Sequence, residues 1–541
     1  MISKTIRLLI VLTMFSAVFA IAPTASAGPE SCDTRVNNTH AKLLECVTVE
    51  GVREHQAAFQ AIADDNGGTR AAGTPGYDAS VEYVVERLTA AGYNVTLDEF
   101  PFQFFPPGVL RQTAPVTVNH ETGVFTASGV GNVSASVTPV DINLTLPRAN
   151  TSGCDGAYTE AAVGAAIVAD PAGPDDFVGF PAGNIALIQR GGCSFALKAY
   201  NAQAAGASAM ILFNQGNDPT REGLIVGTLV VAAGTPGPVT IPVVGASFAS
   251  GVSLAQPGSV ATVTVSAPQN VTQVNVLAES QGGDPNNVVM AGAHLDSVQA
   301  GPGINDNGSG SAALIEVAEQ MAKVNPRNKV RFAWWGAEES GLIGSTQYVA
   351  GLSQAELDRI TLYLNFDMVG SPNHVFFIYY GDNSDGVGSP AGPAGSAEIE
   401  KTFEAFYNSR QIAFKGTDFS GRSDYGPFIN PAIGIPSGGL FTGAEGVKTA
   451  AEAAEPDWGG TAGQQYDPCY HLACDTFANN NNFALDVNSD AIAFAILQYA
   501  MSTQDINDAQ GKGNFPPVSG GGSSNTSTSS QSGHEHELPI D

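Results

Sequence analysis

Apolar and polar positions alternate with different periods along the chain, and each change of period marks a change in the expected structure. Between residues 52 and 92, apolar residues recur at helical spacing in two runs, which predicts two helices around a glycine-rich turn. From 116 to 269, short β-branched runs such as Ile185–Gln189 and Ala209–Phe213 are separated by glycine, proline and asparagine. This second pattern predicts an inserted β-rich domain with one or two helices.

After residue 270 the pattern becomes strand, loop, helix, strand. Val288–Ala293 is apolar at every position, as expected for a central strand that is buried on both faces. A helix is expected over Ser311–Val324, and further strands are expected over Val330–Trp335 and Thr361–Phe366. The alternation predicts an α/β fold with a mixed central sheet flanked by helices.

These patterns divide the chain into five segments. We expect a signal peptide at 1–27, a first part of the main domain at 45–115, the inserted domain at 116–269, the catalytic part of the main domain at 270–505, and a flexible low-complexity tail at 506–541. The tail is rich in glycine, serine, asparagine and threonine, a composition that does not form a packed core.

The first 27 residues have the three parts of a secretory signal. Lys4 and Arg7 precede an apolar run, and the small residues Ala25-Ser26-Ala27 form a cleavage motif. The run is shorter than the ~20 residues that a membrane-spanning helix needs, and no later segment is longer and equally apolar. The sequence therefore predicts a secreted protein, extracellular or periplasmic, without a membrane span.

The net charge and the cysteine content limit which partners and metal sites are expected. The 541 residues include 52 acidic and 23 basic residues, for a formal net charge of −29. This charge argues against a nucleic-acid partner, because phosphate binding needs a basic surface. Six cysteines in an exported chain favour disulfides over a thiolate metal site. Pairing by neighbourhood gives Cys32–Cys46, Cys154–Cys193 and Cys469–Cys474, and the sequence leaves other connectivities open for the first four cysteines.

Metal-competent residues follow three of the expected strands. His294 and Asp296 end the first strand, Glu338 and Glu339 follow the second, and Asp367 follows the third. Ligand sites in open α/β sheets form outside the carboxyl ends of the strands, so these side chains are expected to meet.

Two further segments add donors of the same kind. Asp306 lies in the glycine-rich loop Gly303–Gly310, and His471 lies far along the chain beside a cysteine pair. Imidazole nitrogen and carboxylate oxygen without thiolate suit zinc at a catalytic site. Two ions would share one carboxylate, and a separate carboxylate would carry the proton from water to the leaving group. The adjacent pair Glu338–Glu339 fits this division between base and ligand.

The motifs resemble those of the M28 family of zinc aminopeptidases, over residues 45–115 and 270–505. The matching stretches are Ala293-His294-Leu295-Asp296-Ser297, Gly303–Gly310, Trp334–Glu339, Asn365-Phe366-Asp367-Met368 and Tyr470-His471. The resemblance implies two zinc ions per chain and release of the N-terminal residue from peptides or proteins.

The resemblance also implies a role for each residue. His294 and Asp367 would bind one zinc ion, Glu339 and His471 would bind the other, and Asp306 would bind both. Glu338 would be the general base, and Asp296 would orient His294. Tyr470 would help to hold the developing oxyanion. By weaker matches, Arg422 would contact the substrate and Phe441 would line the pocket for the first side chain, which suggests bulky hydrophobic first residues. Arg422 is equally compatible with an ordinary ion pair.

The inserted segment resembles a protease-associated (PA) domain through Gly183–Phe195, Lys198 and Ala204–Ala207. It contains no cluster of catalytic residue types, so we expect it to gate or select substrates or to be structural. We expect a monomer.

Three other functions are compatible with parts of this pattern. A carboxypeptidase or a glutaminyl cyclase of the same fold would share the metal motifs, and a non-catalytic receptor module would have lost some of them. A calcium site occurs in some relatives, and Asp486 and Asp490 share a helix face here. The matching N-terminal position is Cys46, a poor ligand for a hard cation, so the sequence does not support calcium.

Overall fold

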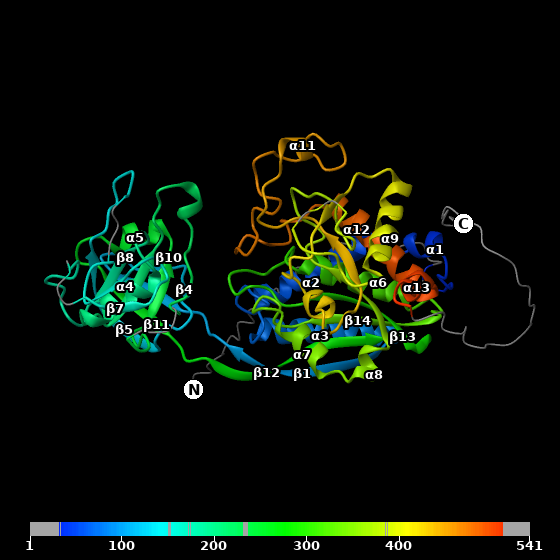
Figure 1. Ribbon diagram of the computed structural model, residues 1–541, viewed down its shortest axis with the longest axis horizontal. Helices are drawn as coiled ribbons and strands as arrows, with labels where there is room; N and C mark the ends of the chain where they lie inside the picture. Colours follow the sequence, from blue (N-terminus) through cyan, green and yellow to red (C-terminus); the bar gives the residue numbers. More distant parts are fainter. Residues whose placement is uncertain are drawn as a thin grey trace, which may run out of the picture. The chain divides into compact units, whose positions relative to one another are not determined.

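The computed structural model describes residues 32, 34–149, 153–170, 173, 175–230, 236–384, 386 and 388–511. The signal peptide expected at 1–27 and most of the tail expected at 506–541 lie outside these residues. The described chain forms two compact units, shown in Figure 1. One contains the residues up to Phe100 and those from Gln273 onward, and the other is Pro101–Thr272.

The first unit is built on a mixed eight-stranded sheet. Its strands, in spatial order, are β1 (Asn94–Phe104), β12 (Gln269–Glu279), β14 (Asn328–Trp335), β13 (Asp284–His294), β15 (Ile360–Phe366), β18 (Ser437–Phe441), β16 (Phe377–Tyr379) and β17 (Lys415–Thr417). The four central strands β14, β13, β15 and β18 are parallel, so their carboxyl ends lie at the same edge of the sheet. That edge carries the candidate site.

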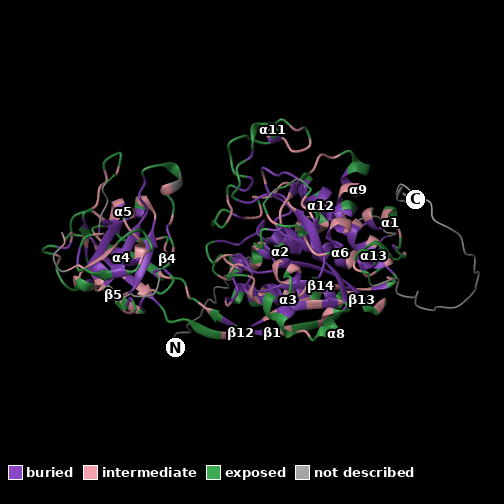
Figure 2. Ribbon diagram, in the orientation of Figure 1, coloured by how far each residue is buried: buried purple, intermediate pink, exposed green. Residues whose placement is uncertain are grey.

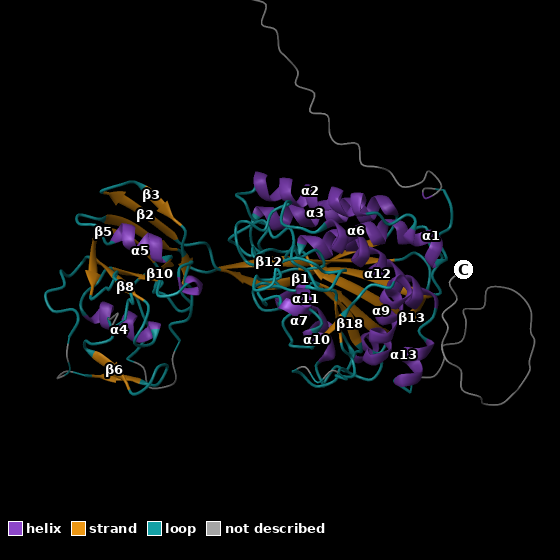
Figure 3. Ribbon diagram, turned by 90° about the horizontal axis from the view of Figure 1, so that it is seen from above, coloured by secondary structure: helices purple, strands orange, loops and turns teal. Residues whose placement is uncertain are grey.

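Helices cover both faces of this sheet, as Figure 3 shows for α2, α3 and α6 on one side and α7 and α10 on the other. The helices of the unit are α1 (His40–Leu44), α2 (Val49–Asp65), α3 (Pro75–Ala91), α6 (Gly308–Met321), α7 (Ile343–Gly351), α8 (Gln354–Leu357), α9 (Ser396–Arg410), α10 (Gly426–Ile429), α11 (Ala450–Ala453), α12 (Asn482–Met501) and α13 (Gln504–Ala509).

Burial on both faces explains the apolar run in β13. Val289 and Ala291 pack with α6 and α12, whereas Met290 between them packs with α7 and α10 on the other face. Figure 2 shows these central strands as buried and the segment around α11 as largely exposed. The predicted α/β architecture is therefore confirmed, and the expected strands and helices differ from the observed ones only at their ends.

The second unit contains its own sheet and two helices. Its strands are β3 (Val118–His120), β2 (Val109–Ala114), β11 (Val260–Val265), β5 (Gly131–Val140), β8 (Ile185–Gln189), β9 (Ala209–Phe213), β10 (Val243–Ala246) and β4 (Gly123–Val124), in spatial order. A separate hairpin joins β6 (Tyr158–Glu160) to β7 (Ile167–Ala169), the helices are α4 (Phe195–Ala204) and α5 (Phe248–Leu254), and a 3-10 turn spans Pro219–Arg221.

All six cysteines form disulfides, which join Cys32 to Cys46, Cys154 to Cys193, and Cys469 to Cys474. None of the described helices combines the length and the apolar composition that crossing a membrane requires.

Candidate active site

The carboxyl ends of three parallel strands bring the candidate ligands together. His294 is the last residue of β13, Glu338 and Glu339 follow β14, and Asp367 follows β15. They border a cavity of about 360 Å³. The sequence-predicted residues that line it are His294, Asp306, Glu338, Glu339, Asp367, Arg422, Phe441, Tyr470 and His471.

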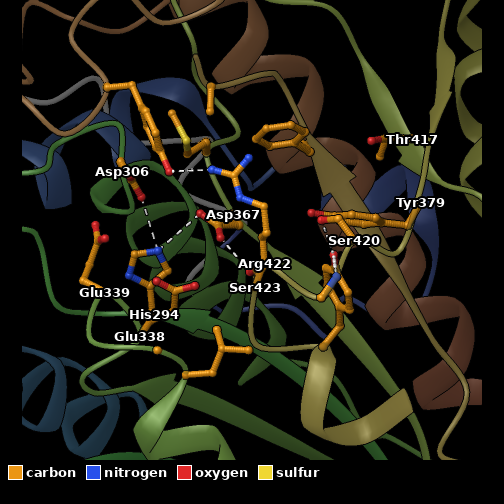
Figure 4. A pocket seen from close by; sticks show the side chains of 18 of the residues that line it. His294, Asp306, Glu338, Glu339, Asp367, Tyr379, Thr417, Ser420, Arg422 and Ser423 are labelled. Carbon is orange, nitrogen blue, oxygen red and sulfur yellow. Dashed lines mark hydrogen bonds and ion pairs between the residues drawn. The ribbon is translucent and has the colours of Figure 1, made fainter. Parts of the chain in front are cut away.

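Asp306 lies between two groups of donors, part of which Figure 4 shows. Its Oδ1 is 3.3 Å from His294 Nε2, and its Oδ2 is 3.2 Å from His471 Nε2. Asp367 Oδ1 is also 3.3 Å from His294 Nε2, and Glu339 Oε2 is 3.0 Å from His471 Nε2. One carboxylate therefore faces two histidines, each of which has a second carboxylate beside it.

The chemistry of these donors fits a pair of zinc ions. His294, Glu338 and Asp367 form one group whose ligand atoms lie within 4.8 Å of one another, and Asp306, Glu339 and His471 form another. Among the residues that the structure describes, Glu339 Oε1 and Asp367 Oδ1 are buried and have no hydrogen-bond partner, which is costly for a carboxylate oxygen unless a cation binds it. Nitrogen and oxygen donors without thiolate are typical of catalytic zinc.

The pKa values of the candidate ligands also favour bound cations. Burial and neighbouring carboxylates raise the pKa of Glu339 to about 7 and that of Glu338 well above its usual range. Burial would lower the pKa of His294, yet the Asp367 and Glu338 carboxylates raise it well above normal. The site thus holds more negative charge than its protein surroundings neutralise, and bound cations would stabilise it.

Asp296 contacts the site in a different way from the sequence expectation. Its main-chain carbonyl accepts the hydrogen bond from His294 Nδ1 at 3.0 Å, while its carboxylate Oδ1 is 3.7 Å from the same nitrogen. The carboxylate accepts from the backbone N–H groups of Glu338, at 3.1 Å, and Glu339, at 3.4 Å. Asp296 therefore fixes the turn that carries the expected base and ligand as well as the imidazole ring.

A buried chain of hydrogen bonds ends on Asp367. Ser423 Oγ donates to Asp367 Oδ2 at 2.6 Å and accepts from Asn365 Nδ2 at 2.8 Å. Tyr363 donates to Asn365 Oδ1 at 3.0 Å, and Trp335 Nε1 donates to the Tyr363 hydroxyl at 2.8 Å. Each donor points toward the Asp367 carboxylate, so this series of hydrogen bonds fixes the orientation of that carboxylate. Ser423 was not among the site residues predicted from the sequence.

Two buried carboxylates join the Asp306 loop to the His471 segment. Asp475 accepts from the backbone N–H groups of Asn305, at 2.8 Å, and Asp306, at 2.9 Å. Asp467 accepts from Asn305 Nδ2 at 2.7 Å. Because both acids flank His471 in the sequence, these contacts hold Asp306 and His471 in a fixed relation.

The glycines of the same loop allow a close approach to β15. A Cβ atom at Gly310 would meet Phe366 O at 2.3 Å. Asn307 caps α6 by accepting from Gly310 N at 2.9 Å, and it donates to Phe366 O at 2.9 Å. The loop that carries Asp306 is thereby tied to the strand end that carries Asp367.

Arg70 is a buried cation behind the site, and sequence reasoning gave it no role. Its guanidinium is fully buried and donates to the carbonyls of Leu295 at 2.5 Å, Pro302 at 2.9 Å and Gly303 at 2.6 Å. Burial lowers the pKa of Arg70 to about 10, still high enough to keep the charge. Arg70 thus links the segments that carry His294 and Asp306. The only local signal was its position in a glycine-rich turn.

The remaining candidates flank the cavity. Arg422 donates to Glu445 at 2.8 Å and to the Tyr470 hydroxyl at 3.2 Å. Arg422 therefore forms an ordinary ion pair, as the sequence also allowed, and at the same time contacts a residue of the candidate site. Burial and the Asp306 carboxylate raise the pKa of Tyr470, which keeps its proton available for donation. Phe441, the last residue of β18, forms part of the cavity wall.

The region considered for calcium has other partners. Arg410 donates to Asp490 at 2.8 Å, and Cys46 is bonded to Cys32.

An α/β sheet with two histidine–carboxylate groups at the ends of its parallel strands is the arrangement of a metal-dependent hydrolase. The sequence matches peptidase family M28 over residues 275–496 and the PA domain over residues 137–254. It is 47% identical to an aminopeptidase of Pseudomonas aeruginosa, over 86% of this chain and 83% of the relative. It is 39% identical to leucine aminopeptidase 2 of Trichophyton rubrum, over 84% of this chain and 83% of the relative.

The fold is similar to that of a zinc aminopeptidase from Bacillus subtilis, with a TM-score of 0.60 at 23% identity, over 85% of this chain and 96% of that one. The chain belongs to peptidase family M28 and is an aminopeptidase with a PA domain.

Proposed function

We propose that the protein is a secreted aminopeptidase with two zinc ions, which releases bulky hydrophobic residues from the N-termini of peptides. The observation that carries the proposal is the position of Asp306, whose two oxygens face two separate histidines. A carboxylate in this position can be shared by two ions.

The ligand roles follow from the two groups of donors. His294 and Asp367 would hold one zinc ion, Glu339 and His471 the other, and Asp306 both. When bound, the ions would polarise the scissile carbonyl and lower the pKa of a water molecule.

Glu338 is the proposed general base. Its carboxylate lies in the group formed with His294 and Asp367, and burial raises its pKa well above the usual range. A carboxyl group with a raised pKa can take a proton from water and return it to the leaving amine. Tyr470 and Arg422 lie together at the cavity and would donate hydrogen bonds to the developing oxyanion.

The cavity also accounts for the choice of substrate. The free α-amine of a peptide would lie near Asp367 and Glu338, where a cation is favoured. Met368, Tyr379 and Phe441 supply apolar walls for the first side chain. A relative is named as a leucine aminopeptidase, in agreement with a hydrophobic first residue.

The proposal includes the export and organisation of the chain. Residues 1–27 would be removed as a signal peptide, and three disulfides suit an oxidising compartment. The peptidase domain would comprise 45–115 and 270–505, with the PA domain at 116–269 gating or selecting substrates. The enzyme would act as a monomer.

Hydrolysis of aminoacyl-p-nitroanilides tests the proposal. We expect cleavage of leucyl and phenylalanyl substrates, loss of activity with a chelator and its return on adding zinc. Activity that persists with the chelator, or on N-acetylated substrates, would overturn it. Zinc per chain, measured by mass spectrometry, tests the number of ions.

A further inference from the structure

The cavity extends from the metal-competent side chains into a pocket whose wall changes character along its length. Near Asp367, apolar side chains such as Met368 and Phe441 line it. Three polar or acidic residues of the wall come from the segment that ends β17 and continues beyond it. These residues are Thr417, Asp418 and Ser420.

Asp418 is the charged member of this group. It is half-buried, and its Oδ2 accepts two long hydrogen bonds of 3.2 Å from the backbone N–H and the hydroxyl of Ser389. Within the part of the chain that the structure describes, no lysine, arginine or histidine forms an ion pair with Asp418. Arg422, the arginine of the cavity wall, already pairs with Glu445 at 2.8 Å. The negative charge at Asp418 is therefore not neutralised by the protein.

Tyr379 connects the two parts of the pocket. Its side chain lies beside Ser420 in Figure 4, on the far side of Arg422 from His294. Burial raises the pKa of Tyr379 well above its usual range, and the carboxylates of Asp367, Glu338 and Asp418 add to the effect. The tyrosine is thus within electrostatic reach of both the metal-competent carboxylates and Asp418. Because Tyr379 and Asp418 line the same cavity, a long substrate side chain that packs against the ring can approach Asp418.

We propose that Asp418 extends the range of first residues to lysine and arginine, by binding their charged ends while the apolar walls contact their methylene stems. Long basic side chains combine an apolar stem with a cationic end, which matches this sequence of walls. The hydroxyls of Thr417 and Ser420 offer further acceptors for an ammonium or guanidinium group. The inference rests on the proposed aminopeptidase site, because the α-amine must be bound at the metal-competent end.

The test compares substrates of equal shape and different charge. On the wild-type enzyme, arginyl-p-nitroanilide should have a kcat/KM about 10-fold or more above that of citrullyl-p-nitroanilide, its uncharged analogue. Lysyl-p-nitroanilide should be cleaved as well. Equal values for arginine and citrulline, or cleavage of leucine without lysine or arginine, would overturn the inference. This comparison requires no variant.

Variants locate the effect at Asp418. Asp418→Asn keeps an acceptor for Ser389 and should lower kcat/KM for lysine about 10- to 100-fold, with leucine and norleucine changed by less than about 3-fold. Asp418→Glu should retain the lysine activity. Asp64→Asn, at an exposed position of α2 outside the cavity lining, removes the same charge and should leave the lysine-to-norleucine ratio unchanged.

The outcomes separate this inference from the proposed function. If Asp418→Asn lowers lysine and norleucine equally, or if Asp64→Asn reproduces its effect, Asp418 does not select for charge. Chelator-sensitive cleavage of leucyl substrates would then still support the aminopeptidase site. Hydrolysis of N-acetylated substrates would instead overturn the proposed function itself.

Discussion

Replacing Ser423 by alanine removes one hydroxyl from the chain of hydrogen bonds that ends on Asp367. The change takes away a donor at 2.6 Å from Asp367 Oδ2 and leaves Asn365 Nδ2 without its acceptor at 2.8 Å. A hydrogen bond to a charged group contributes about 1.5–3 kcal/mol, and an unpaired buried donor costs about 1–3 kcal/mol. Loss of an outer-shell partner lowers metal affinity by about 10- to 100-fold.

We therefore expect Ser423→Ala to weaken zinc binding at the His294–Asp367 position by about 10- to 100-fold. The position formed by Glu339 and His471 should be unaffected. Titration of the metal-free protein against zinc–chelator buffers would then show two separated binding steps. Ser420→Ala is the matched control, because its exposed hydroxyl contacts only Tyr425, at 3.3 Å, among the described residues. Affinities unchanged within about 3-fold, or an equal loss in the control, would refute the role of the chain.

Two predictions concern stability. The pKa of Glu316 is raised by burial to about 8, so the native state favours the protonated form, and stability falls as pH rises from about 4.5 to 8. Glu316→Gln should raise the free energy of unfolding by about 2–5 kcal/mol near pH 9 and change it little near pH 4. Thermal unfolding at both pH values measures this difference, and an equal effect of the substitution at pH 4 and pH 9 would contradict the raised pKa of Glu316. Arg70→Met removes three hydrogen bonds from a buried cation to main-chain carbonyls, of which, among the described residues, only Gly303 O keeps a second donor, the backbone N–H of Gly308. It should cost about 4 kcal/mol or more, whereas Arg87→Met, in a partly exposed ion pair, should cost about 1 kcal/mol. Similar melting temperatures for the two arginine variants would contradict this account.

The local pattern predicted three central strands of the eight-stranded sheet, β13, β14 and β15, and the candidate ligands that follow them. Val288–Ala293 is uniformly apolar because both faces of β13 are covered, and this makes the strand visible without coordinates. Residues that follow such strands at the carboxyl edge must meet, since the strands are parallel. His294, Glu339 and Asp367 could therefore be grouped from the sequence.

The supporting contacts could not be predicted in the same way. Arg70 binds the carbonyl of Leu295, 225 positions along the chain, and Asp475 binds the backbone of Asp306, 169 positions away. No periodicity links such pairs, because each depends on how distant loops pack. The same holds for Asp296, whose carbonyl rather than its carboxylate bonds the imidazole. A residue type predicts that a hydrogen bond is possible, but the tertiary structure selects the atom that makes it.

The most direct test of the account is a paired measurement of zinc content and turnover in Glu338→Gln and Glu339→Gln. The account predicts that Glu338→Gln keeps two zinc ions per chain and loses about 10²- to 10⁴-fold in kcat, because only the proton carrier is removed. Glu339→Gln should weaken the binding of the ion held with His471. Loss of zinc from the Glu338 variant, or two tightly bound ions in the Glu339 variant, would contradict the division between base and ligand.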